Sequence, residues 1–291
     1  MNQEPVVLDV RDLIKHHRTP AGQWVRPGGR GLVKAVDGVS LTLHRGETLA
    51  LVGESGCGKS SLARLLTAVD RPTSGEVSVL GTRMDQLRGR ALRAARRGIQ
   101  MVFQDPYSSL DRRMTAGDLV REPLLIHRGI APRGTHRQYV AELLELVGLS
   151  PDHAGRRPHE FSGGQRQRIG VARALALRPE ILVCDEPVSA LDVSVQAQIV
   201  NLFMRLQREL GVAYLFIAHD LAVVEHIADR VAVMRDGRLV EQGPTEQIYE
   251  HPQHPYTRTL LACAPTPERP RADPPGLPSP VEEAASDNST P

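Results

Sequence analysis

The chain has 291 residues, enough to bury one large hydrophobic core or two small ones, and its 36 Lys and Arg nearly balance 34 Asp and Glu. Because no strong electrostatic field results, we expect no nucleic-acid partner. The cysteines are scattered without metal-ligand spacing, and no apolar run approaches the roughly 20 residues that span a bilayer. The N-terminus also lacks the apolar stretch of a signal peptide, so we expect a cytoplasmic protein that reaches a membrane only through a partner.

Short apolar segments between Gly and Pro predict the strands. Near the N-terminus these segments are Val6–Val10, Val33–Leu43 and Glu76–Leu80. Later apolar runs are typical of buried parallel strands, at Gly98–Phe103, Ile181–Asp185, Tyr214–Ala218 and Arg230–Met234. Helical periodicity lies between the strands, over Ser60–Val69, Arg137–Val147, Gln165–Leu177, Val193–Leu210 and Leu221–Ala228. The pair Asp236-Gly237 predicts a hairpin turn.

The alternation of strands and helices predicts an α/β domain over residues 1–263. Helical periodicity without an obvious strand over Thr115–Glu160 indicates a helical insert in this domain, at about residues 115–165. From Ala264 the chain is rich in proline and nearly free of large apolar residues. Such a segment buries too little apolar surface to offset its ordering entropy, so we expect a disordered tail over 264–291.

The segment Leu49–Ser61, LALVGESGCGKSS, has the pattern of a phosphate-binding loop. An apolar run leads into G-x-x-x-x-G-K-S, and a glycine-rich turn between a strand and a helix lets backbone N–H groups converge on an anion. Gly53 and Gly58 stand where a Cβ would block the turn or the phosphate. Lys59 supplies a positive charge for the β- and γ-phosphates, and the Ser60 hydroxyl can ligate Mg²⁺. We predict that the chain binds a nucleoside triphosphate.

Two adjacent carboxylates end the apolar run in Ile181–Pro187, ILVCDEP. In a parallel sheet, Asp185 and Glu186 would stand at the carboxyl edge, where such folds bind ligands. Asp185 can hold Mg²⁺, and Glu186 can orient or deprotonate the water that attacks the γ-phosphate. A solvated acidic turn is the alternative, which the phosphate loop in the same chain disfavours.

A third motif, Ser162-Gly163-Gly164-Gln165, stands at a predicted helix start. Ser162 can cap that helix, and the two glycines expose backbone N–H groups at its positive end, which can bind an anion. A capped helix with a basic outer face would explain Ser162 but not two consecutive glycines. The phosphate loop, the FSGGQ signature and the Asp-Glu strand, in this order and spacing, resemble the ATP-binding cassette family.

This resemblance covers Val6–Pro265 and implies a P-loop NTPase core with a mixed sheet, an antiparallel β subdomain and a helical insert. It implies an ATPase that uses ATP and Mg²⁺ in a head-to-tail dimer, where the signature of one subunit closes over ATP bound to the other. It makes Gln104 the Q-loop residue, Asp192 part of the D-loop, and Glu186 and His219 catalytic. The residues implied to bind ATP are Gly53, Glu54, Ser55, Gly56, Cys57, Gly58, Lys59, Ser60, Ser61 and Gln104. Those implied to bind Mg²⁺ are Ser60, Gln104 and Asp185.

Within the family, stretches such as MVFQDPYSSLDRRMT and HPYTRTLLACAP resemble the ATPase subunits of oligopeptide and dipeptide importers. This likeness implies two integral-membrane permease subunits, an extracytoplasmic solute-binding protein and a second ATPase subunit, identical or homologous. The chain would then lie at the cytoplasmic face of the cell membrane. The ATPase subunits of importers for nickel, glutathione and other small solutes share many of these sequence motifs. The motifs therefore do not identify the transported solute. A non-transport P-loop ATPase or kinase is a distant alternative that the SGGQ motif disfavours.

The chain departs from that group at two places. The group usually stacks adenine on an aromatic residue near the end of the first strand, where this chain has Lys15-His16-His17. His17 aligns best and is the candidate adenine platform, with Trp24 or another residue of Pro20–Arg30 as the alternative. The tail contains Leu277-Pro278-Ser279-Pro280 without the cysteine-rich motif that often follows it, so we expect no iron–sulfur cluster.

Cys57 lies inside the phosphate loop, beside Lys59 and close to a predicted helix N-terminus. Both neighbours favour the thiolate form of a cysteine. Alkylation or oxidation of Cys57 would then block ATP binding, although the position also fits a small side chain of free identity.

Overall fold

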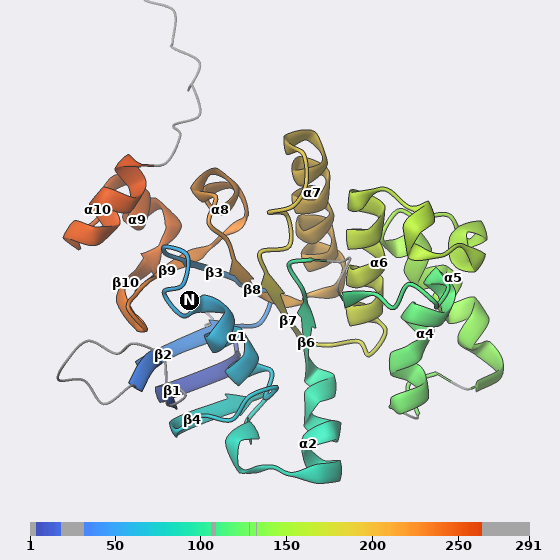
Figure 1. Cartoon of the computed structure of the whole chain (residues 1–291), viewed down its shortest axis with the longest axis horizontal. Helices are drawn as coiled ribbons and strands as arrows, with labels where there is room; N and C mark the ends of the chain where they lie inside the picture. The colour runs from blue at the N-terminus through green and yellow to red at the C-terminus, as the bar shows by residue number, and fades with distance from the viewer. Residues whose placement is uncertain (1–3, 19–31, 106–108, 128, 132, 264–291) are drawn as a thin grey trace, which may run out of the picture.

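The computed structural model describes residues 4–18, 32–105, 109–127, 129–131 and 133–263. In this part of the chain a central sheet has the strand order β10 (Arg238–Pro244), β9 (Arg230–Arg235), β3 (Thr48–Val52), β8 (Ala213–Ile217), β7 (Ile181–Asp185) and β6 (Ile99–Val102). The pairs from β9 to β6 are parallel, whereas β10 runs antiparallel to β9 (Figure 1). The predicted mixed sheet is confirmed. Every residue of β3, β7 and β8 is buried, which is why these strands are continuous apolar runs.

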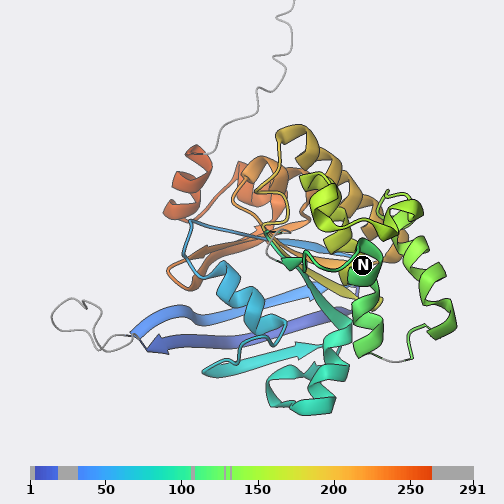
Figure 2. The same cartoon turned by 45° about the vertical axis from the view of Figure 1, so that its right-hand side comes forward.

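An antiparallel sheet lies beside the central one, with the strand order β2 (Leu32–His44), β1 (Val6–Arg18), β4 (Ser74–Val79) and β5 (Thr82–Arg83). Helix α1 (Lys59–Leu66) lies between the two sheets and shares one core with both (Figures 1 and 2). β1 continues well beyond the predicted Val6–Val10, because a bulge at Asp12, with φ of 46°, interrupts the alternation before Leu13 resumes it. The bulge hides the second half of the strand from a simple pattern count.

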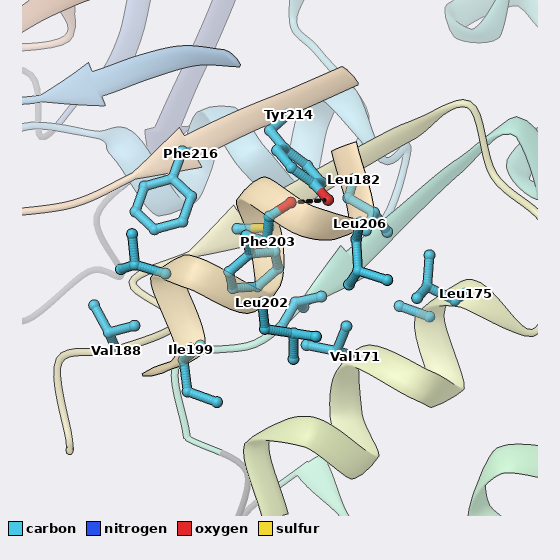
Figure 3. Packing of buried hydrophobic residues seen from close by; sticks show 14 of the residues in the cluster. Val171, Leu175, Leu182, Val188, Ile199, Leu202, Phe203, Leu206, Tyr214 and Phe216 are labelled. Atoms are coloured by element: carbon cyan, nitrogen blue, oxygen red, sulfur yellow. Dashed lines mark hydrogen bonds between the residues drawn. The ribbon is translucent and has the colours of Figure 1, made fainter. Parts of the chain in front are cut away.

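The opposite face of the central sheet is packed by helices α6 (Gly163–Leu175) and α7 (Val193–Leu210), and helices α4 (Ala116–Ile126) and α5 (His136–Leu146) pack against α6. Phe203 of α7 packs edge-on against Tyr214 and Phe216 of β8, with ring centroids 5.5 and 5.8 Å apart, and Tyr214 Oη donates a hydrogen bond to the Phe203 carbonyl (Figure 3). Such pairs bind α7 firmly to the sheet. α4 and α5 fall within the predicted helical insert, whose boundaries as a domain remain a prediction.

The other helices in the described ranges are short: α2 (Gly89–Ala95), α8 (Leu221–Ile227), α9 (Thr245–Glu250) and α10 (Pro255–Ala262). Segments of 3₁₀-helix lie at Met84–Gln86, Arg96–Gly98, Arg133–Thr135, Pro151–Gly155 and Pro158–Glu160. The sequence predicts neither α9 nor α10, because each is short and contains few apolar residues to mark a helical period. The N-cap residue His254 followed by Pro255 is the local signal that could have revealed α10.

Three predictions fall on residues that lie outside the described ranges: the disordered tail over 264–291, the absence of a cysteine-rich cluster motif there, and Trp24 or Pro20–Arg30 as an adenine platform. Within the described ranges, no helix combines the length and the apolar character needed to cross a membrane.

Candidate functional site

The phosphate loop leaves β3 after Val52 and enters α1 at Lys59, as predicted. Gly53 and Gly58 have φ of 152° and 114°. A Cβ on Gly53 would stand 2.1 Å from the Met234 carbonyl oxygen, and one on Gly58 would stand 2.0 Å from the Ala35 carbonyl oxygen. Close packing against the backbone of β9 and β2 therefore requires glycine at both positions, independently of any bound phosphate.

Lys59 is buried inside this loop, with 4% of its surface exposed. Its Nζ donates hydrogen bonds to the carbonyl oxygens of Gly53 (2.7 Å) and Glu54 (2.9 Å). Neutral carbonyls satisfy the ammonium hydrogens without cancelling its charge, so the loop keeps a positive charge that attracts an anion. Ser55 and Gly56 lie in the same loop, and Ser61 lies in the first turn of α1.

The prediction of a stabilised thiolate at Cys57 is wrong. Burial raises the pKa of the Cys57 thiol above its ordinary value, and the opposing effect of Lys59 is smaller. The sulfur is 3.9 Å from the Lys59 ammonium, yet desolvation of the anion outweighs that attraction.

The carboxyl end of β7 lies against the start of α1. Ser60 Oγ donates a hydrogen bond to Asp185 Oδ1 at 3.2 Å, which joins residues 125 positions apart in the sequence. Asp185 is 8% exposed, and burial raises its pKa while the Ser60 hydrogen bond lowers it. A buried carboxylate beside a hydroxyl provides the hard oxygen ligands that Mg²⁺ prefers, so these residues fit that ion.

Glu186, Gln104 and His219 come together at the carboxyl ends of β7, β6 and β8. Gln104 Nε2 donates a hydrogen bond of 2.8 Å to Glu186 Oε2, and His219 Nδ1 lies 3.7 Å from the same oxygen. Glu186 also has a left-handed backbone with φ of 46°, which costs a non-glycine residue roughly 1–2 kcal/mol. Such strain is concentrated at functional sites, where the surrounding structure maintains it.

The signature segment begins α6 with reciprocal hydrogen bonds. Ser162 Oγ accepts from the Gln165 backbone N–H (3.3 Å), and Gln165 Oε1 accepts from the Ser162 backbone N–H (3.0 Å). The predicted cap at Ser162 is thus confirmed, as one half of a capping box. A Cβ on Gly164 would stand 2.5 Å from Val195 Cγ1 on α7, so close helix packing accounts for this glycine without any ligand. Contrary to the expectation from the sequence, Gly164 therefore has a structural explanation in the fold of the chain itself.

The D-loop and the adenine platform are less closely tied to the loop. Asp192 is exposed and precedes α7 as its N-cap residue, and its carbonyl accepts from the Val195 N–H. His17 is exposed on β1, where it pairs with Val33. The neighbouring His16 is hydrogen-bonded to the Asp37 carboxylate on β2. Stacking of adenine on His17 remains a prediction.

The structure adds two contacts to the phosphate loop that sequence analysis missed. The Gly237 backbone N–H, at the β9–β10 turn, donates to the Cys57 carbonyl at 2.9 Å. Tyr256 Oη, on α10, accepts from the Glu54 backbone N–H at 3.1 Å. Local sequence patterns cannot predict these hydrogen bonds, because the residues that form them are far apart in the chain.

Comparison with known proteins agrees with this geometry. A model of the ABC transporter family matches residues 36–189, and one of the oligopeptide/dipeptide transporter C-terminal region matches residues 240–287. The chain is 54% identical to a probable peptide ABC transporter ATP-binding protein of Sinorhizobium fredii, over 91% of this chain and 74% of the other. It is 51% identical to the oligopeptide transport ATP-binding protein OppF of Bacillus subtilis, over 90% and 83%.

A glutathione import ATP-binding protein of Escherichia coli is also 54% identical, over 93% of this chain but 43% of the longer protein. Among solved structures, the fold is similar to a dimeric post-hydrolysis state of the ATP-binding cassette MJ0796 bound to ADP and Pi, with a TM-score of 0.71 and 29% identity over 82% of this chain and 98% of that one. Sequence motifs, fold and relatives thus agree on one family. The chain belongs to the ATP-binding cassette family, as an ATP-hydrolysing protein of its oligopeptide/dipeptide transporter group.

Proposed function

We propose that this chain powers the import of peptides by hydrolysing ATP at the site formed by the phosphate loop and Glu186. The observation that carries the proposal is the convergence of Gln104 and His219 on one carboxylate oxygen of Glu186. That carboxylate stands one residue beyond Asp185, which is bonded to the first turn of α1. A general base is thereby held next to the phosphate-binding loop.

In this proposal Lys59 and the backbone N–H groups of the loop bind the β- and γ-phosphates. Ser60, Asp185 and Gln104 would hold Mg²⁺, which supplies a counter-charge for the phosphates when bound. Glu186 accepts a proton from the attacking water, and Gln104 holds its carboxylate in place. His219 is 60% exposed at its side chain, so it is free to contact the γ-phosphate that the loop presents.

The second half of the site would come from another cassette. Ser162, Gly163, Gly164 and Gln165 of the opposing subunit close over the γ-phosphate, and Asp192 lies at the same contact. This head-to-tail arrangement is supported by the exposed position of Ser162 and Asp192 and by the dimeric state of the related MJ0796 cassette. The partner cassette is identical or homologous.

The solute is inferred from relatives whose names refer to peptides. We propose that the chain acts at the cytoplasmic face of the membrane, with two integral-membrane permease subunits and, indirectly, an extracytoplasmic solute-binding protein. Glutathione is the second candidate solute, because a glutathione import protein is as similar as the peptide relatives. Uptake of labelled dipeptides, oligopeptides, glutathione and nickel, in cells with and without this chain, separates these candidates. Nickel uptake alone would refute peptide import.

Replacement of Glu186 by Gln tests the catalytic assignment. In the assembled transporter we expect unchanged ATP affinity and a turnover at least about a hundredfold lower, since every phosphate contact remains while the base is lost. Lys59→Ala should instead weaken ATP binding itself. Glu180→Gln is the matched control: Glu180 directly precedes the same strand at its other end and pairs with Arg45 at the surface. Near-normal hydrolysis by Glu186→Gln would refute the role of Glu186.

A further inference from the structure

Tyr256 connects the last described helix to the phosphate loop. The phenol is 6% exposed, and its Oη accepts a hydrogen bond from the backbone N–H of Glu54, 202 residues earlier in the chain. The same peptide unit contributes the Gly53 carbonyl, which accepts from Lys59 Nζ at 2.7 Å. The C=O and N–H of a planar trans peptide point in opposite directions. Tyr256 therefore holds one side of the peptide group whose other side holds the lysine.

The ring of Tyr256 is itself fixed by strand β9. The Arg235 guanidinium lies over the ring, 4.8 Å from its centroid, at the end of the strand whose Met234 carbonyl faces Gly53. The phenol is protonated at physiological pH even at the ordinary tyrosine pKa of about 10, and burial raises the pKa of Tyr256 further, so its oxygen accepts the Glu54 hydrogen bond as a neutral hydroxyl.

The start of α10 is anchored to the central sheet. Glu241 on β10 accepts hydrogen bonds from the backbone N–H groups of Gln253 (2.7 Å) and His254 (3.0 Å). His254 in turn caps the helix, since its Nδ1 accepts from the Tyr256 N–H at 3.1 Å. The hydroxyl of Tyr256 is thus held by a chain of contacts that begins in the sheet rather than by a free helix.

We propose that Tyr256 is a positioning residue that sets the ATP affinity of the phosphate loop by orienting the Gly53–Glu54 peptide and, through it, Lys59. This inference rests on the proposed nucleotide site. Glu186, Gln104 and His219 lie at the ends of other strands, so loss of the phenol hydroxyl leaves the hydrolytic groups untouched. Tyr256 thereby gives the C-terminal region a direct effect on nucleotide binding.

The test is Tyr256→Phe, which removes the acceptor and keeps the ring under Arg235. We expect Kd and KM for ATP to rise roughly two- to tenfold, the effect of one hydrogen bond, with kcat at saturating ATP unchanged. Amide hydrogen exchange in the peptide that contains Glu54 should become faster. Tyr139→Phe is the matched control, because its hydroxyl bonds the Ala176 carbonyl in the helical region and should alter none of these values.

A second variant, Arg235→Gln, keeps the hydroxyl but removes the cation over the ring, and it should raise KM less than Tyr256→Phe does. If Tyr256→Phe does not fold, a raised KM for ATP in Arg235→Gln supports the inference, and a wild-type KM in that variant overturns it. Wild-type KM in Tyr256→Phe, an equal rise in Tyr139→Phe, or a fall in kcat at unchanged KM would each overturn the inference. Failure of the wild-type protein to bind ATP would instead refute the proposed nucleotide site.

Discussion

At the scale of single residues, the three cysteines show how burial decides reactivity. Cys184 is wholly buried in β7, and burial raises its pKa far above the ordinary thiol value. Cys57 is partly buried in the phosphate loop and follows the same rule, even with a lysine beside it. Cys263 is exposed. Charge alone predicts a reactive Cys57, but desolvation of the thiolate is the larger effect.

We therefore expect iodoacetamide to modify Cys263 before Cys57 at pH 7.5. A raised pKa leaves less thiolate at a given pH. The modification rate of Cys57 should therefore keep rising above pH 8.5, whereas a thiol with the ordinary pKa of about 8.5 would begin to level off there. ATP should slow the reaction at Cys57 and leave Cys263 unaffected. Mass spectrometry of each cysteine across the pH range measures both effects, with the unfolded chain as reference. Faster labelling of Cys57 than Cys263 at pH 7.5 would show that the thiolate is stabilised after all.

At the scale of secondary-structure elements, Asp37 joins β1, β2 and the β9–β10 hairpin. Its carboxylate accepts hydrogen bonds from Arg238 (2.6 Å) and His16 (3.0 Å) and lies 3.3 Å from the Lys34 ammonium. Its backbone N–H donates to the Gly237 carbonyl, next to the contact that the hairpin makes with the phosphate loop. The hydrogen bond from Arg238, followed by that from His16, holds the pKa of Asp37 well below its usual range.

Asp37→Asn should lower the urea midpoint at neutral pH, because the charge-assisted bonds to Arg238 and His16 are weakened. A depressed carboxyl pKa stabilises the fold above the unfolded value of about 3.9 and loses that effect as pH falls further. The difference between wild type and Asp37→Asn should thus persist from pH 7 to pH 5 and shrink below about pH 4. Asp9→Asn, which breaks a pair with the exposed Arg11, is the control with little expected effect. A difference that grows in acid would contradict the assignment.

At the scale of the whole molecule, the phosphate loop and the signature segment, which are the two halves of the proposed site, each form hydrogen bonds within themselves. Lys59 bonds the carbonyls of its own loop, whereas Ser162 and Gln165 bond each other at the start of α6. Each half can therefore fold without the other, and a nucleotide between two chains would complete both. In a head-to-tail dimer, Lys59 and Ser162 of one chain belong to different sites.

This arrangement makes a prediction for mixed dimers purified through two different tags. A Ser162→Arg chain paired with a Lys59→Ala chain should keep one intact site, because both lesions fall in the same one. A chain that carries both substitutions, paired with a wild-type chain, should keep none. Trapped nucleotide per dimer, measured in the assembled transporter, distinguishes the two pairings. Equal trapping in both would refute the head-to-tail arrangement.

Local sequence patterns predict the parts of this protein that depend on neighbouring residues. The apolar run before G-x-x-x-x-G-K-S predicts β3, the loop and α1 correctly, and the polar residue before the signature glycines predicts the cap at Ser162. Asp185 and Glu186 stand at the end of β7 as the apolar run Ile181–Asp185 predicts. Periodicity and capping act over a few residues, so they can be recognised without the fold.

The contacts that each of these parts makes with distant residues depend on the tertiary structure. In the folded chain Gln104 is hydrogen-bonded to Glu186, 82 residues away, and Tyr256 is hydrogen-bonded to the phosphate loop, 202 residues away. Val195 packs closely against Gly164. The tertiary structure also buries Cys57 enough to reverse the pKa shift that Lys59 alone would cause. Hydrogen bonds between distant elements, close helix contacts and desolvation depend on which surfaces pack together, and no local pattern in the chain encodes that choice.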